Sequence, residues 1–155
     1  RVRLQAFRAL SILDELGHRG CAALDSLHRL CEQTETDVDL RLRALSTIER
    51  IAPRGNQDAI TIFIAMLRDD HFFMKTNAMA CLERMAQQGD QRALTAAHAC
   101  LQDDVAQVRH AAVMAIGELA HVDDEQTITV LLECLDDKSE DRSPLRGVEI
   151  VNPFT

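Results

Sequence analysis

Hydrophobic positions recur along the chain with the spacing of one face of an α-helix, and the pattern itself occurs four times. Each repeat places an alanine between apolar residues four positions before it and four and seven positions after it. These offsets lie on one side of a helix. We therefore predict a first helix, helix A, in every repeat, near residues 2–16, 37–52, 71–87 and 105–120. The aligned alanines, 38, 34 and 34 residues apart, are Ala6, Ala44, Ala78 and Ala112.

A second apolar pattern begins 15 residues after each alanine, or 17 residues after it in the first repeat. It predicts a helix B near residues 21–32, 57–68, 91–102 and 125–136. One helix pair is too thin to bury both of its apolar faces, so a core forms only if the pairs stack on one another. We expect an all-α fold, a right-handed α-solenoid of four antiparallel helix pairs.

The repeats cover most of the chain. The predicted stack occupies residues 1–137, with repeats at about 1–35, 36–69, 70–103 and 104–137. The next repeat would place a helix A over Pro144, which is unfit for a helix interior. We therefore expect residues 138–155 to form an irregular C-terminal tail or cap.

Residues with suitable N-capping chemistry precede the predicted helices. Those before helix B are Gly20, Asn56, Asp90 and Asp124. Those before helix A in the last three repeats are Thr36, Asp70 and Asp104. Asp39 and Gln107 follow two of these residues at the spacing of a capping box.

The fourth repeat carries the most regular motif. Residues 108–119 read Val-Arg-x-x-Ala-x-x-Ala-Ile-Gly-x-Leu and follow a Leu-x-Asp-Asp turn. This stretch resembles a HEAT repeat of the short type known from phycobilisome lyases, and weaker copies extend over residues 2–137. Such repeats occur in scaffolds, adaptors, lyases and hydroxylases, so the resemblance indicates a fold more than a function. It also implies a structural ladder of basic helix-A residues and inter-repeat aspartates: Arg41, Lys75 and Arg109 with Asp69 and Asp103.

Composition narrows the class of protein. The net charge is −8, and only 3% of residues are aromatic, with no Trp or Tyr. Because nucleic-acid binders need clustered Lys and Arg and stacking platforms, we expect no nucleic-acid partner. No apolar run is long enough to cross a bilayer, so we expect no membrane span. Five cysteines without a CxxC pair favour a reduced, cytoplasmic protein with unbridged thiols. The helical pattern starts at Arg1, so we expect a piece of a longer protein.

Candidate chemistry is sparse. His28 with Glu32 and His121 with Glu125 have the i, i+4 spacing of two ligands on one helical face. The di-iron hydroxylases with HEAT-like repeats carry His-Glu dipeptides, and this chain contains none. Cys100 occupies a largely apolar repeat position, as its equivalent Cys134 does, which is typical of packing residues. We expect no catalytic residue, no metal and no cofactor. The alternative is a subunit of a bilin-lyase-type or other HEAT-like enzyme that acts on a small molecule in the groove.

The surface of the helix-B row is the best candidate site. In stacks of this type the B helices line a concave side, so polar or small residues on them form the floor of a groove. This pattern predicts a non-catalytic scaffold or adaptor that docks a protein or peptide, with a basic partner segment at the acidic C-terminal end. The predicted groove residues are Asp25, Arg29, Glu32, Thr61, Ala65, Arg68, Thr95, Ala99, Gln102, Thr129, Glu133 and Asp136.

The predicted fold can be tested on a single alanine. We expect a far-UV circular dichroism spectrum dominated by helix. Ala112→Asp should lower the free energy of unfolding by about 3 kcal/mol or more, because it buries an unpaired charge at the contact between A helices. Urea denaturation of both proteins measures this difference. A wild-type spectrum dominated by strand would exclude the solenoid.

Overall fold

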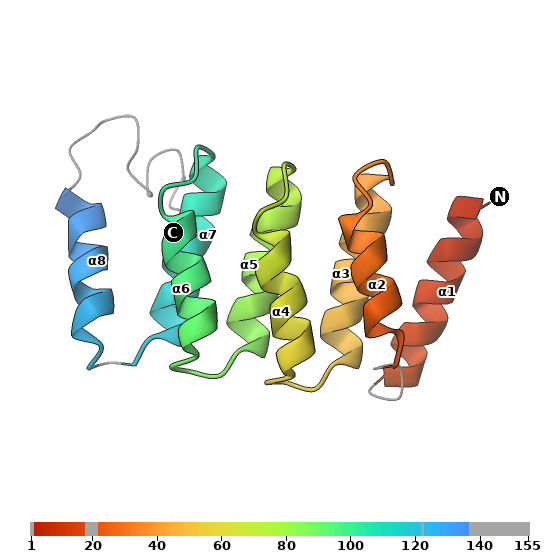
Figure 1. Ribbon diagram of the computed structural model, residues 1–155, viewed down its shortest axis with the longest axis horizontal. Helices are drawn as coiled ribbons and strands as arrows, with labels where there is room; N and C mark the ends of the chain where they lie inside the picture. Colours follow the sequence, from red (N-terminus) through yellow and green to blue (C-terminus); the bar gives the residue numbers. More distant parts are fainter. Residues whose placement is uncertain (1, 18–21, 122, 137–155) are drawn as a thin grey trace, which may run out of the picture.

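The computed structural model describes residues 2–17, 22–121 and 123–136, and these residues form eight helices and no strand (Figure 1). The tail expected at 138–155 lies outside the described residues. No helix in the described part combines the length and the apolarity that a bilayer crossing requires. In chain order the helices are α1 (Val2–Leu16), α2 (Leu24–Glu32), α3 (Val38–Ile51), α4 (Gln57–Met66), α5 (Phe72–Met85), α6 (Gln91–Cys100), α7 (Ala106–Leu119) and α8 (Glu125–Asp136).

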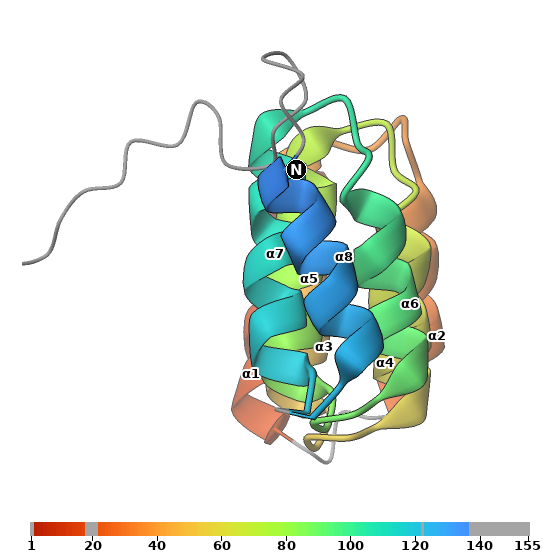
Figure 2. The ribbon, with the colours of Figure 1, turned by 90° about the vertical axis from the view of Figure 1, so that its left-hand side faces the viewer.

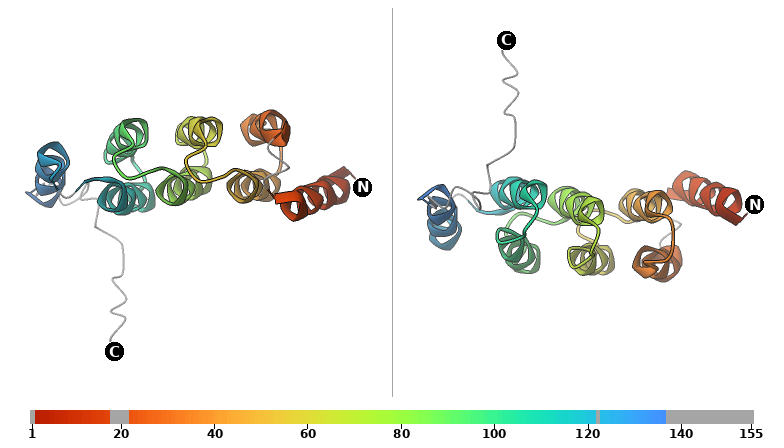
Figure 3. Two further views of the ribbon diagram at one scale, coloured as in Figure 1. Left: turned by 90° about the horizontal axis from the view of Figure 1, so that it is seen from below. Right: turned by 90° about the horizontal axis from the view of Figure 1, so that it is seen from above.

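The helices form two rows, which confirms the predicted α-solenoid. The A helices α1, α3, α5 and α7 stand side by side in one row, and α2, α4 and α6 stand in a second row against them (Figure 3). The view along the stack shows the same two layers, with α8 at the near end (Figure 2). The rows run almost straight in Figure 3.

Packing pairs each B helix with the A helix that follows it in the chain. The helix α2 lies against α3, α4 against α5 and α6 against α7, whereas consecutive helices of one sequence repeat, such as α3 and α4, share few contacts. The packing unit is therefore offset by one helix from the sequence repeat. In the described part, α8 has no A helix after it. Its Ile128 is 46% exposed, although the equivalent Ile60 and Leu94 are buried.

The repeated alanine allows the A helices to pack closely. Ala44, Ala78 and Ala112 have no exposed surface, whereas Ala6, on the first helix, is half-buried. The A helices contact one another extensively, and a buried alanine leaves room for a neighbouring backbone to approach. The continuous A row is what holds the pairs in register.

Side-chain caps begin three of the B helices. Asn56 accepts a hydrogen bond from the backbone N–H of Ala59 at 2.9 Å, and Asp90 accepts from Arg92 and Ala93. Asp124 accepts from the N–H and the hydroxyl of Thr127, and these bonds lower the pKa of its carboxyl. The caps predicted from Asn56, Asp90 and Asp124 are confirmed, and Gly20 lies outside the described residues.

The caps predicted for the A helices are wrong by one residue. The N-cap residues are Asp37, His71 and Val105, where we expected Thr36, Asp70 and Asp104. Two of these helices receive their side-chain acceptor from the preceding turn. Asp69 accepts the backbone N–H of His71 at 2.8 Å, and Asp103 accepts that of Val105 at 2.9 Å. Each of these carboxylates also interacts with a basic residue. That residue is distant in the sequence, so the residues around the cap do not reveal the interaction.

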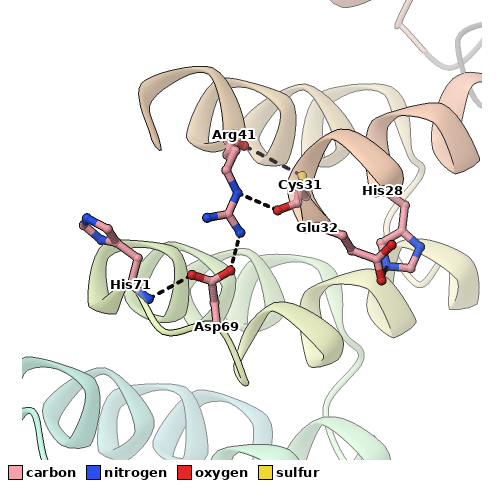
Figure 4. Close-up of polar contacts among 6 residues, drawn as sticks. All are labelled: His28, Cys31, Glu32, Arg41, Asp69 and His71. Carbon is pink, nitrogen blue, oxygen red and sulfur yellow. Dashed lines mark hydrogen bonds and ion pairs between the residues drawn. The ribbon is translucent and has the colours of Figure 1, made fainter. Parts of the chain in front are cut away.

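That interaction is a buried ion pair between Arg41 and Asp69. The Nη2 of Arg41, in α3, donates to Oδ2 of Asp69, and only 3% and 7% of the two side chains are exposed. The Nε of Arg41 also donates to the carbonyl of Cys31, at the end of α2, at 2.6 Å. Figure 4 shows the guanidinium between these two acceptors, with the other oxygen of Asp69 on the N–H of His71. One arginine and one aspartate therefore join α2 and α3 to the start of α5.

The same arrangement recurs one repeat later. Lys75 Nζ, in α5, lies 2.6 Å from Oδ2 of Asp103. Arg109, in α7, donates Nη1 to the carbonyl oxygens of Asp103 and Asp104 at 2.8 and 3.0 Å. The structure thus brings Arg41 to Asp69 and Lys75 to Asp103, and it turns Arg109 toward the turn before its own helix.

Backbone hydrogen bonds join the repeats at the other end of the A helices. The N–H of Gly55 donates to the carbonyl of Met85 at 2.7 Å, and that of Gly89 donates to Leu119 at 2.6 Å. Both glycines have φ of 82°, a left-handed conformation that other residues adopt only at a cost. The turns after α3 and α5 are therefore tied to the end of the next A helix.

The buried ion pair should be important for stability. Asp69→Ala should lower the free energy of unfolding by about 3–5 kcal/mol, because it leaves Arg41 buried without its counter-charge. Urea denaturation measures the change. The exposed neighbour offers a matched control, since Asp70→Ala should cost less than about 0.5 kcal/mol. Equal losses for the two variants would contradict a special role for Asp69.

Candidate binding cleft

A cleft lies between α4 and α6 on the B face. Its volume is about 590 Å³, within the range of 300–1,000 Å³ typical of ligand sites. Ten residues from the two helices and the turns after them line it: Ile64, Leu67, Arg68, Gln91, Arg92, Thr95, Ala96, Ala99, Cys100 and Asp103.

The cleft exists because the B helices touch only sparsely. The A row sets the spacing between repeats, and α4 and α6 share few contacts. Small side chains on α6, Ala96 and Ala99, leave the space between the two helices open. Ile64 and Leu67 of the other wall supply apolar surface. The recess is thus a consequence of tight packing in one layer and small residues in the other.

Two arginines give the cleft a positive character. Arg92 reaches across to α4, where Nη1 donates to Gln57 Oε1 at 2.9 Å and Nη2 donates to Thr61 Oγ1 at 2.7 Å. Both partners are neutral, so the charge of Arg92 is not compensated. Arg68 is exposed, and its side chain forms no hydrogen bond or ion pair with any described residue. The only acidic residue in the lining, Asp103, is paired with Lys75.

Threonines at equivalent positions mark the outer face of three B helices. The hydroxyls of Thr61, Thr95 and Thr129 each donate to the carbonyl four residues earlier, at 2.7–2.8 Å. These bonds use the hydroxyl proton and leave the oxygen lone pairs as acceptors, and the oxygen of Thr61 accepts the bond from Arg92.

The predicted groove residues fall into two groups. Three of them, Arg68, Thr95 and Ala99, line the cleft. The others lie outside the cleft lining. Ala65 is half-buried, the side chain of Asp136 lies outside the described residues, and the remaining side chains are exposed. This second group is Asp25, Arg29, Glu32, Thr61, Ala65, Gln102, Thr129, Glu133 and Asp136.

Sequence reasoning missed the second arginine. Arg92 is one residue from the start of α6, and the predicted stripe began three positions later at Thr95. Its equivalents in α4 and α8 are Asp58 and Gln126, so a basic residue at this position breaks the repeat pattern. This departure from the repeat pattern is the signal from which Arg92 could have been found in the sequence. The apolar wall from Ile64 was missed because the residue fits a core position equally well.

The histidines do not gather into a ligand set. His28 Nε2 lies 3.3 Å from Glu32 Oε1 across one turn of α2 (Figure 4). His121 is exposed and lies where a Cβ on Gly89 would overlap its ring. Among the described residues, no three His, Cys, Asp or Glu side chains converge as metal ligands would.

The three described cysteines are buried free thiols. Burial raises the pKa of Cys31 and of Cys81 to about 12. Burial also raises the pKa of Cys100, which lines the cleft, to about 11, with Asp103 adding to the rise and Lys75 opposing it. A nucleophilic cysteine needs the thiolate, which is about one part in ten thousand at neutral pH for such a pKa. Cys21 and the side chain of Cys134 lie outside the described residues.

The repeat geometry agrees with a comparison to known families. Residues 75–143 match the family model for HEAT repeats. This segment belongs to the HEAT-repeat family. One wall of the cleft, α6, lies inside the matched HEAT segment, and the other wall, α4, belongs to the preceding pair with the same offsets. No curated protein and no solved structure matches the chain.

The state of the cleft thiol can be measured. At pH 7.5, iodoacetamide should alkylate Cys100 of this HEAT stack at least tenfold more slowly than free cysteine, because the pKa of Cys100 is raised to about 11. The rate should rise steeply between pH 7 and pH 9.5 as the thiolate fraction grows. Mass spectrometry of the Cys100 peptide after timed quenching follows the reaction. Fast alkylation that does not change with pH would show an activated thiol.

Proposed function

We propose that the chain is a non-catalytic scaffold or adaptor whose B face docks another protein. HEAT repeats are in general protein-interaction scaffolds, and the repeats of this chain supply the matching architecture. The cleft between α4 and α6 carries the proposal, because it is the recess on the face where the repeat pattern places small and polar residues.

The extended shape and the exposed polar residues of this face suit a polypeptide partner. Extended surfaces of stacked repeats bind chains over several repeats, and the exposed residues here run from Asp25 in α2 to Glu133 in α8. A central recess with an apolar wall provides an anchor, and polar positions around it provide a rim. Anchor and rim together are the usual anatomy of a docking site.

Charge divides the B face into regions. The last helix carries Glu125 and Glu133, both exposed, so we propose that a basic segment of the partner lies over α8. We also propose a cytoplasmic setting for the complex, since the cysteine pattern favours a reducing compartment.

The enzymatic alternative has less support. A lyase of the bilin type would need a reactive group near its substrate, and Cys100 is the nucleophilic residue type in the cleft lining. Its raised pKa keeps it protonated. Mixing the protein with a bilin and recording the visible absorbance distinguishes the two functions, because a tightly bound chromophore with a shifted band would support the lyase reading.

The docking face can be tested by mutation. A photo-crosslinking amino acid at Thr95 should trap the partner, which is then purified and titrated against variants. Arg68→Glu and Glu133→Arg should each weaken the complex about tenfold, because both side chains are exposed on the B face. Isothermal titration calorimetry measures the dissociation constants, which should increase with salt as exposed charges are screened.

The opposite face supplies the control. Glu83→Lys, on the A helix α5, makes a charge change of the same size and should alter the dissociation constant less than twofold. Circular dichroism verifies that each variant folds. A partner that tolerates both B-face variants but loses affinity for Glu83→Lys would move the docking site to the A row.

A further inference from the structure

We propose that the α4–α6 cleft receives an apolar side chain of the partner that is flanked in the partner's sequence by an aspartate or glutamate. This inference rests on the proposed docking function and names the chemistry that the cleft would select. It differs from the basic segment proposed for α8, which concerns the other end of the same face.

The charge of the cleft selects a carboxylate. Arg68 and Arg92 are on opposite walls, and neither has an acidic partner among the described residues. The acidic lining residue Asp103 is already engaged by Lys75 at 2.6 Å. An arginine guanidinium presents donors in a planar fork that matches a carboxylate, so an acidic side chain at the rim could bind either arginine.

The surroundings of the cleft reinforce this choice. The helix α6 contains no acidic residue, and α4 contains one, Asp58. The flanking helices are different, because α2 has Asp25 and Glu32 and α8 has Glu125 and Glu133. The lining of the cleft thus holds two arginines and one aspartate that is already paired, although the whole chain has a charge of −8.

The wall of the cleft selects an apolar side chain beside the carboxylate. Ile64, Leu67, Ala96 and Ala99 are the aliphatic residues of its lining. A volume of about 590 Å³ accommodates a leucine, a methionine or a phenylalanine together with part of the partner backbone. Burying such a side chain supplies affinity, and the adjacent carboxylate supplies orientation.

Charge order then sets the direction of the partner along the face. Its acidic residue lies over α4 and α6, and its basic residues lie over α8. A peptide docked in the reverse direction would place its carboxylate against Glu133 and its basic residues against Arg68, which like-charge repulsion disfavours.

A phage-displayed library of random 12-residue peptides provides the test. The wild-type protein is the bait, and Ala99→Phe, which fills the cleft from an exposed position, is the counter-selection. Enriched peptides should carry Asp or Glu next to Leu, Ile, Met or Phe. Fluorescence anisotropy of the synthetic consensus peptide should show at least a tenfold loss of affinity for Ala99→Phe and for Arg68→Glu.

A matched arginine controls for overall charge. Arg54→Glu, at an exposed position in the α3–α4 turn, changes the net charge by the same amount and should leave the affinity within twofold. Arg68→Lys should fall between wild type and Arg68→Glu, because it keeps the charge but loses the fork. The affinity should decrease as salt is raised.

The outcomes separate this inference from the docking function. Peptides that need an open cleft but have a basic or uncharged consensus would overturn the acidic partner and leave the docking face in place. In a parallel selection without the counter-selection, peptides that bind Ala99→Phe and Arg68→Glu normally but lose Glu83→Lys would overturn the docking face itself. A selection that enriches no peptide over the counter-selection would also count against the cleft as an anchor.

Discussion

The carboxylate of Asp69 joins more of the structure than any other single group described above. One carboxylate oxygen accepts a hydrogen bond from Arg41 in α3, and the other accepts one from the backbone N–H of His71, just before α5. The same arginine extends to the carbonyl of Cys31 at the end of α2. A buried charge pair of this kind costs desolvation, so its value lies in fixing which groups meet. Here it fixes the position of one helix pair against the next.

Contacts within the A row set the spacing of the repeats, and this spacing explains why the B helices have few contacts with one another. The A helices are held by their contacts with one another, by the Arg41–Asp69 and Lys75–Asp103 pairs at one end, and by the Gly55 and Gly89 backbone bonds at the other. The B helices rest on the A helices and barely touch one another. Their outer surface is therefore free to carry small, polar and charged residues without loss of the core.

How far the sequence predicted this structure depended on the range of each interaction. Helix positions and the caps at Asn56 and Asp90 follow from residues within one turn, and periodicity or capping chemistry reveals them. The cap of α5 was missed because Asp69 is positioned by Arg41, 28 residues earlier. The candidate cleft was found in part, through Arg68, Thr95 and Ala99. Arg92 and the pairing of each B helix with the following A helix depend on contacts between repeats, which no local pattern encodes.

Because α4 and α6 share few contacts, a rotation between neighbouring helix pairs can change the distance between these two helices. With the A row as pivot and the two layers about 10 Å apart, a rotation of roughly 5° between neighbouring pairs changes the width of the cleft by about 1 Å. A side chain seated between the helices acts as a wedge, because it resists that rotation. Occupancy of the cleft would therefore stiffen the stack at one joint, and the angle between its two halves would depend on what lies between α4 and α6.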